Sequence, residues 1–283
     1  MSLSKMNNNL SGIHNYGYNC FINSILQCMK FSSSIISGII NEEEHRKDIE
    51  YLRMINSCNE DEIETDPTLK EHNIDISRIK KLNIYFHFKK LIIELCKNNI
   101  TVDPQELIMA CKKDADERGL NDLFCGNQCD AEEFLTFLLD SLHEAKIYEY
   151  DIPLTYSVVT DDDDVHKKII YNSEEKFKKE YSQKYSWVLK ELFNKQATIT
   201  NCSNCSYYTI NYDSQHILQL PILENMVSTS IYDYLNNYFG KEILDCWKCD
   251  SCDNTNGNSK QYRFIECPQT LIIQLKRFEY CTK

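Results

Sequence analysis

Residues 12–27 read GIHNYGYNCFINSILQ, and this stretch decides how the chain is interpreted. A loop with two glycines leads into apolar residues at helical spacing, and Cys20 stands at the junction. The first turn of a helix has unpaired backbone N–H groups and a partial positive charge, which favour the thiolate form of a cysteine. Because the thiolate is the reactive form, Cys20 is a candidate nucleophile. The ordinary alternative is a buried cysteine that acts as a small apolar side chain.

The neighbours of Cys20 favour the nucleophile. Apolar side chains recur from Phe21 to Met29, so the opposite face of this helix is expected in a core. Glycines in the loop permit close backbone approach to a substrate. Asn15 can offer a side-chain N–H to a developing oxyanion. We therefore expect Cys20 and Asn15 to line the mouth of a groove.

Residues 128–143 read QCDAEEFLTFLLDSLH and predict a second amphipathic helix, with a core face formed by Phe134, Phe137, Leu138 and Leu142. On pattern alone, the acidic residues of its first turn complement the helix dipole. Asp103 and Pro104 predict another helix start, with Asp103 as the N-cap and the proline at the first helical position.

Two Cys-x-x-Cys pairs predict a metal site. They are Cys202 with Cys205 and Cys249 with Cys252, each beside short β-type segments. Four thiolates supplied by two tight turns fit a tetrahedral, closed Cys₄ zinc site of structural type. Unliganded thiols are the alternative, and Cys246 is a spare thiol close to the second pair.

The composition bounds the function. The 283 residues are 42% hydrophobic and 26% charged, which is typical of a globular protein. A formal net charge of −12 argues against nucleic acid as a partner and is compatible with a basic protein. No secretory signal or membrane-length apolar run is visible, so we expect an intracellular protein, cytoplasmic or nuclear, without membrane association. Its 14 cysteines are then expected as thiols and metal ligands.

Residues 12–27 resemble the cysteine box of the ubiquitin-specific proteases. The matching positions are Gly12, Asn15, Gly17, Cys20, Phe21, Asn23, Ser24, Leu26 and Gln27. The chain departs at Ile13 and at Asn19, where the family usually has threonine or serine. The segment that begins at Gln128 resembles the second box of the family.

The resemblance implies that Cys20 is the nucleophile and Asn15 the oxyanion donor. It also implies that Gln128, Asp130 and Glu133 help to hold the ubiquitin tail, because carboxylates can pair with the arginines of that tail. It selects Cys249 and Cys252, together with the first pair, as zinc ligands in a subdomain that grips ubiquitin.

The fold implied by the resemblance is α+β, of the papain-like cysteine protease type. A helical thumb is expected over residues 10–190, with charged insertions at 41–77 and 151–185, the second read as a mobile loop. Zinc-ribbon fingers follow over 191–265, and the start of an antiparallel palm sheet over 266–283. Residues 1–9 are expected to be disordered.

The resemblance further implies a catalytic histidine box and a later Asp or Asn, beyond the Leu-Lys-Arg-Phe strand at residues 275–278. None of the seven histidines follows a glycine or lies after that strand. Three explanations stay open: a longer gene product, a separate polypeptide that supplies the palm, or a protein that binds ubiquitin without cleaving it.

We therefore expect a thiol-dependent deubiquitinase that cleaves the isopeptide or peptide bond at the C-terminal glycine of ubiquitin through a Cys20 acyl-enzyme. The alternative is a catalytically silent ubiquitin-binding or scaffold protein. A third reading, a zinc-ribbon interaction protein unrelated to ubiquitin, predicts metal binding without ubiquitin affinity.

Overall fold

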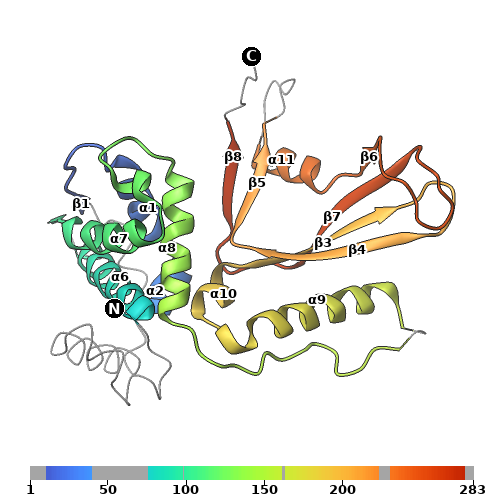
Figure 1. Cartoon of the computed structure of the whole chain (residues 1–283), viewed down its shortest axis with the longest axis horizontal. Helices are drawn as coiled ribbons and strands as arrows, with labels where there is room; N and C mark the ends of the chain where they lie inside the picture. The colour runs from blue at the N-terminus through green and yellow to red at the C-terminus, as the bar shows by residue number, and fades with distance from the viewer. Residues whose placement is uncertain (1–10, 40–75, 98, 161–162, 223–229, 278–283) are drawn as a thin grey trace. The chain divides into compact units, whose positions relative to one another are not determined.

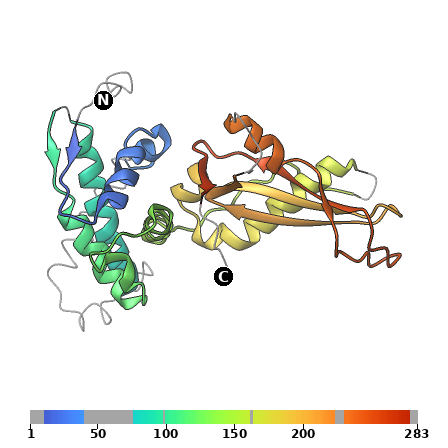
Figure 2. The ribbon, with the colours of Figure 1, turned by 90° about the horizontal axis from the view of Figure 1, so that it is seen from above.

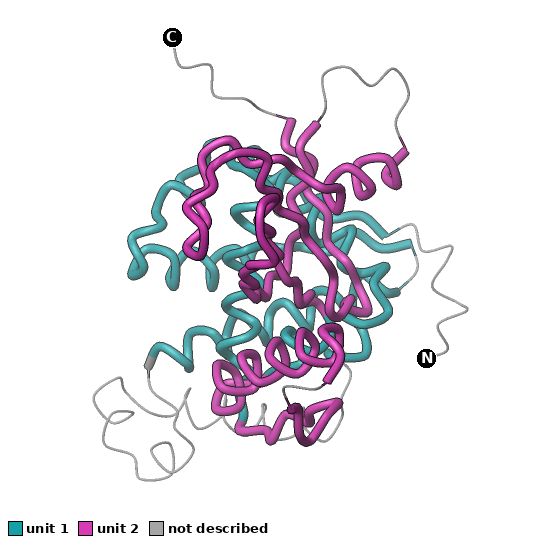
Figure 3. The backbone as a smooth tube through the Cα atoms, turned by 90° about the vertical axis from the view of Figure 1, so that its right-hand side faces the viewer, with its two compact units in different colours: residues 1–148, 186–191 teal, residues 149–185, 192–283 magenta. Residues whose placement is uncertain are grey.

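The computed structural model describes residues 11–39, 76–97, 99–160, 163–222 and 230–277. The chain divides into two compact units (Figure 3): residues 1–148 with 186–191, and residues 149–185 with 192–283. The expected disorder of residues 1–9 lies outside the described residues, as does the charged insertion at 41–77 except for its last two positions. The predicted mixture of helices and strands is confirmed.

The first unit is helical. Its elements are α1 (Cys20–Met29), α2 (Ser33–Ile39), α6 (Ile76–Leu95), α7 (Gln105–Glu117), the 3₁₀ turn η2 (Asn121–Phe124), α8 (Ala131–Ala145) and most of α10 (Trp187–Leu192). Helix α8 packs against both α1 and α6 (Figure 1). The apolar face predicted for α8 is buried, and its Phe134 and Leu138 are fully inaccessible, as is Leu26 of α1. Burial of these side chains supplies most of the stability of such a unit.

A pair of two-residue strands anchors the cysteine loop. Strand β1 (Gly12–Ile13) pairs in parallel with β2 (Thr101–Val102), and the His14 amide donates to the carbonyl of Val102. Helix α7 follows β2 directly. Its first helical residue is Gln105 and its N-cap is Pro104, so the predicted N-cap at Asp103 and helix start at Pro104 were each one position too early; Asp103 Oδ1 nevertheless accepts from the Gln105 amide at 2.9 Å.

The second unit contains a four-stranded antiparallel sheet in the order β4-β3-β7-β6. Its strands are β3 (Asn194–Asn201), β4 (Tyr208–Gln215), β6 (Glu242–Leu244) and β7 (Asn258–Glu266). Thr198 of β3 lies opposite Asn211 of β4 on one side and Tyr262 of β7 on the other. This register brings the β3–β4 turn and the β6–β7 turn to the same end of the sheet.

The expectation of an antiparallel palm start was wrong. Strand β8 (Ile272–Lys276) pairs in parallel with β5 (Ile217–Pro221), and Gln219 lies opposite Gln274. Parallel neighbours require a long crossover connection. Here the chain between them passes through α11 (Ile231–Tyr238), β6 and β7.

The expected mobile loop at 151–185 was also wrong, because α9 (Val165–Tyr181) and the 3₁₀ turn η3 (Ser182–Lys184) occupy it. Ile169, Ser173 and Phe177 recur every four residues and form the buried face of α9, which packs along β3 and β4 (Figures 1 and 2). Asp164 caps the helix by accepting from the His166 amide. Residues 149–185 therefore belong to the β-rich unit. The helical thumb predicted from the sequence extended to residue 190 and included 151–185.

Among the residues that the structure describes, none of the helices combines the length and apolar character needed to cross a bilayer.

Candidate active site and metal centre

Cys20 is the first residue of α1, and its side chain is exposed. The sequence predicted this position, and the structure excludes the alternative of a buried apolar cysteine. The helix behind it is amphipathic, with Phe21, Ile22 and Leu26 directed into the core. Helix α1 is therefore anchored in the core by one face and exposes the Cys20 thiol to solvent.

The loop before Cys20 is held by side-chain amides. Asn15 Oδ1 accepts from the Gly17 amide at 3.1 Å, and Gly17 has a φ of 98°, in the region that favours glycine. Because its oxygen faces this amide, the Nδ2 group is the part of Asn15 left to donate to a ligand. Asn15 itself is exposed, so this donor is available at the surface.

Asn19 holds the same loop from its other end. The residue is buried, its Oδ1 accepts from the Tyr16 amide at 3.0 Å, and its Nδ2 lies 3.5 Å from the His14 carbonyl and 3.4 Å from Asn23 Oδ1. The departure from threonine or serine at this position therefore has a structural role. Sequence reasoning noticed the change but did not predict these bonds.

Three further contacts of the loop were not predicted. The Tyr16 hydroxyl donates to Asp103 Oδ2 at 2.8 Å, which joins the cysteine loop to the start of α7. The hydrogen bond to Asp103 raises the pKa of Tyr16. Gln27 Nε2 and Lys30 Nζ both donate to the carbonyl of Ser11, at 3.1 and 3.3 Å. The match of Gln27 to the cysteine box was the one sequence signal for this anchor.

The residues of the second box lie at the start of α8. Asp130 is the N-cap, and its Oδ1 accepts from the Glu132 amide at 2.8 Å, as the dipole interpretation expects. Gln128, Asp130 and Glu133 are all exposed. These three side chains form a polar and anionic surface region that a basic peptide can contact.

The first turns of α1 and α8 lie side by side. Phe21, next to Cys20, packs edge-on against Phe134 with ring centroids 5.9 Å apart. Phe124, just before the second box, packs against the same Phe134 ring at 6.3 Å. This aromatic cluster brings the candidate nucleophile and the exposed residues of the second box to the same end of the helix pair.

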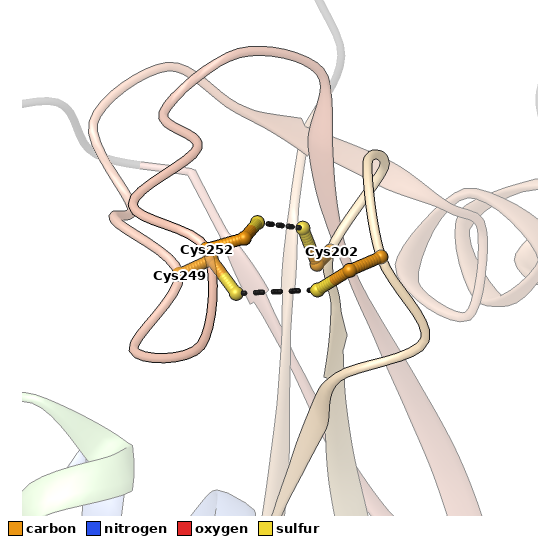
Figure 4. A group of neighbouring side chains, drawn as sticks. Cys202, Cys249 and Cys252 are labelled. Carbon is orange, nitrogen blue, oxygen red and sulfur yellow. Dashed lines mark hydrogen bonds between the residues drawn. The ribbon is translucent and has the colours of Figure 1, made fainter.

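The two Cys-x-x-Cys pairs meet at the tips of the β3–β4 and β6–β7 turns (Figure 4), as predicted. The sulfurs of Cys202 and Cys252 are 3.6 Å apart, and those of Cys205 and Cys249 are 3.7 Å apart. All four sulfurs lie within 4.8 Å of one another, so they can hold a metal ion. A tetrahedron with Zn–S bonds of about 2.3 Å has edges of about 3.8 Å, which the Cys202–Cys252 and Cys205–Cys249 separations match.

The electrostatics of the four thiols also fit a cation. Burial opposes ionisation of Cys202, but the amides of Asn204 and Cys205 and the Cys252 thiol lower its pKa to about 6. The Tyr207 amide favours the Cys205 thiolate, yet burial and the three neighbouring sulfurs raise the pKa of Cys205 to about 12. One thiolate thus suppresses the next, and a bound cation removes that repulsion.

Comparison with known proteins identifies the relatives of the chain. A family model described as "Ubiquitin carboxyl-terminal hydrolase" matches residues 11–283. Ubiquitin carboxyl-terminal hydrolase 25 of Arabidopsis thaliana is 25% identical over 282 residues, which cover 98% of this chain and 35% of the relative. Ubiquitin hydrolase B of Dictyostelium discoideum is 30% identical over 199 residues, which cover 64% of this chain and 42% of the relative.

Among solved structures, the SAGA DUB module with Ubp8, Sgf11, Sus1 and Sgf73 bound to monoubiquitin matches with a TM-score of 0.57 and 20% identity, over 99% of this chain and 50% of that one. The same module bound to ubiquitin aldehyde matches with a TM-score of 0.56 and 19% identity, over 98% and 49%. The chain thus spans about half of the matched structures and less than half of these curated relatives.

Proposed function

The chain belongs to the ubiquitin carboxyl-terminal hydrolase family, and from this membership we propose that it is a thiol-dependent deubiquitinase with Cys20 as its nucleophile. The observation that carries the proposal is the exposed Cys20 thiol at the first residue of α1, beside a loop that leaves the Asn15 amide group free to donate. A thiol buried in the core, or one in mid-helix, would not support it.

In the proposed reaction, the Cys20 thiolate attacks the carbonyl carbon of the C-terminal glycine of ubiquitin. Asn15 Nδ2 donates to the oxygen that becomes negatively charged, a contact worth about 3–4 kcal/mol where one such donor was removed. The C–N bond then breaks, the amine leaves with a proton, and water releases the acyl group from Cys20.

We assign the ubiquitin tail to the exposed side chains at the start of α8. Asp130 and Glu133 provide carboxylates that can pair with arginines of an extended peptide, and Gln128 provides an amide for its backbone. The aromatic cluster around Phe134 supports this assignment, because it holds these residues at the end of α8 that adjoins Cys20.

We further assign a structural Zn²⁺ to Cys202, Cys205, Cys249 and Cys252. The support is the match between the sulfur separations and the edge of a zinc tetrahedron. When bound, the ion supplies cross-linking of the two turns and no chemistry, because four thiolates fill its coordination sphere.

The test is covalent capture by ubiquitin that carries an electrophile at its C-terminus. The wild-type chain and a Cys28→Ala variant should be labelled, because Cys28 is an exposed thiol of the same helix with no assigned role. Cys20→Ala should not be labelled. Labelling of Cys20→Ala at the wild-type rate would contradict the assignment.

Capture and turnover are measured separately, because none of the histidines of the sequence lies in a family-type histidine box. Cleavage of a ubiquitin–amide substrate that Cys20→Ala abolishes would support a complete enzyme. Ubiquitin binding without capture or turnover would support the silent ubiquitin-binding protein, and metal binding without ubiquitin affinity would support an unrelated zinc-ribbon protein.

A further inference from the structure

Two cysteines outside the metal centre and the cysteine box lie together before α8. The thiols of Cys125 and Cys129 both donate to the carbonyl of Asp122, at 3.0 and 3.3 Å from its oxygen. The sum of these two distances is an upper limit on the separation of the sulfurs. Cys125 is exposed and Cys129 is partly exposed, so a small molecule can reach the pair.

The backbone between the two cysteines already turns back on itself. Gly126 has a φ of 86°, in the region that favours glycine, and residues 125–127 form a bend between the two cysteines. Disulfide formation needs the two Cβ atoms to come within about 4.5 Å of each other. Two side chains that share one acceptor across a tight turn need only a small movement to reach this geometry.

We propose that Cys125 and Cys129 are an oxidisable dithiol, which hydrogen peroxide converts to an intramolecular disulfide. The exposed Cys125 attacks the peroxide, so an S–O bond forms, the O–O bond breaks and one water leaves. The Cys129 sulfur then attacks the Cys125 sulfur, so the S–S bond forms, the S–O bond breaks and a second water leaves. Two thiols lose two electrons and two protons, and the peroxide is reduced to two waters.

The surroundings divide these roles between the two sulfurs. Asn127 Nδ2 lies 3.1 Å from the Cys125 sulfur and can stabilise its anionic form. Burial, and then the neighbouring Cys125, Glu133 and Asp122, raise the pKa of Cys129. This raised pKa disfavours Cys129 as the first nucleophile, and its thiol gives up its proton to the leaving oxygen when its sulfur attacks the oxidised Cys125.

Closing the disulfide changes the loop that carries the second box. Oxidation removes both thiol hydrogens, so the Asp122 carbonyl loses both of these donors. The new ring contains Gln128 and adjoins Asp130, so both residues must shift. Resting on the proposed function, this shift is expected to weaken ubiquitin binding about tenfold, the effect of one lost charge-assisted hydrogen bond.

The sequence provides a direct test. Trypsin cuts after Arg118 and Lys146, and residues 119–146 contain Cys125, Cys129 and no other cysteine. The Cys20→Ala chain is loaded with Zn²⁺, treated with hydrogen peroxide, alkylated and digested. We expect this peptide to be lighter by two hydrogen atoms and without alkyl groups, while Cys28 stays reactive toward alkylation. Two alkyl groups on the peptide, sulfinic acids, or a link to another peptide would overturn the proposal.

Ubiquitin affinity is then compared before and after peroxide, in the Cys20→Ala chain and with Cys125→Ser and Cys129→Ser added. The loss should occur only where both thiols are present and should reverse with a dithiol reductant. A disulfide that leaves the affinity unchanged would refute the effect on binding. No ubiquitin binding in either redox state would instead refute the proposed function, while the peptide result still decides the dithiol.

Discussion

Removal of the metal from the Cys₄ centre should open both turns that carry it and leave the sheet intact. The turns span residues 202–207 and 245–257, between the strands β3, β4, β6 and β7. Of the four cysteines, only Cys249 is buried, so the turns have little apolar core of their own. On the proposed function, their order comes from the assigned metal and from a few hydrogen bonds.

The structure allows those hydrogen bonds to be counted. Asn258 Oδ1 accepts from the Ser203 amide at 3.0 Å, Ser203 Oγ donates to the Asn256 carbonyl at 2.6 Å, and Asn254 Nδ2 donates to Ser203 Oγ at 2.9 Å. The Tyr207 hydroxyl also donates to Asp250 Oδ2 at 3.2 Å. At about 1 kcal/mol net for each, these four bonds hold the turns together by about 4 kcal/mol. A structural zinc ion contributes about 10–16 kcal/mol in isolated fingers, so the metal dominates.

The assay is hydrogen exchange with and without a chelator, with metal content measured in parallel. The amides of Cys249 and Asp253 bond across the second turn, to the carbonyls of Asn254 and Cys249. Without metal, their protection should fall to about a thousandfold or less, the equivalent of about 4 kcal/mol. The ladder between Thr198 and Tyr262 should keep its protection.

Cysteine variants complete the test. Cys252→Ser should lose the stoichiometric metal, and Cys246→Ser should retain it, because Cys246 is an exposed thiol outside the cluster. Equal protection of the turns with and without chelator would refute the reasoning that the metal provides their order. Loss of metal in Cys246→Ser would refute the ligand set.

Three further predictions concern the helical unit. Phe134→Ala should lower the free energy of unfolding of this unit by about 3–5 kcal/mol, and Phe134→Leu should lower it by much less. Hydrogen exchange in α8 measures both changes, and a loss below about 1 kcal/mol in Phe134→Ala would contradict the packing argument. Burial, and then Asp114, raise the pKa of Cys111 above its unfolded value. The stability that this thiol provides is therefore complete below about pH 8.5 and is lost as the pH rises toward the folded pKa. Cys111→Ala should lose less stability at alkaline pH in denaturation experiments, and an unchanged slope of unfolding free energy against pH would contradict this. Tyr16→Phe should slow capture of Cys20 by the ubiquitin electrophile about threefold to tenfold, because the loop loses its bond to Asp103, while the melting temperature stays nearly constant; unaltered capture kinetics would show that this bond does not position the loop.

The sequence predicted those parts of the site that depend on local spacing. The position of Cys20 at a helix start and the spacing within each Cys-x-x-Cys pair are patterns of residues close together in the chain. Their geometry could therefore be predicted. The helix α9 was missed because charge blocks concealed the four-residue recurrence of Ile169, Ser173 and Phe177. This buried face is narrow, so the local sequence pattern did not predict a helix there.

Other features depend on contacts between distant residues and leave no local signal. Strands β1 and β2 have two residues each, and their pairing joins residue 12 to residue 101. The parallel pairing of β5 and β8 depends on the path of about 50 intervening residues, which no periodicity within either strand encodes. The bond from Tyr16 to Asp103 follows from the first of these pairings, so it could not be predicted either.

The two helix starts that meet at Phe134 differ in local chemistry, as the proposed binding surface at α8 and the proposed nucleophile at α1 require. At α8, the Asp130 side chain accepts from the Glu132 amide, and Glu132 and Glu133 add negative charge to the first turn. One of its amides is capped by the Asp130 side chain, and the turn presents carboxylates to solvent.

At α1, the residue before the helix is also one that commonly caps, but it does not cap here. Asn19 directs its side chain back to Tyr16, His14 and Asn23, and among the described residues no side chain bonds the first-turn amides of α1. That turn also lacks acidic residues. Its N–H groups and partial positive charge are therefore available to an anion at Cys20, either the thiolate or the oxyanion formed on it. A hydroxyl has a single hydrogen to donate, whereas the Asn19 amide group faces two acceptors, the His14 carbonyl and Asn23 Oδ1, while its oxygen accepts from Tyr16. The asparagine therefore fixes the loop without capping the helix.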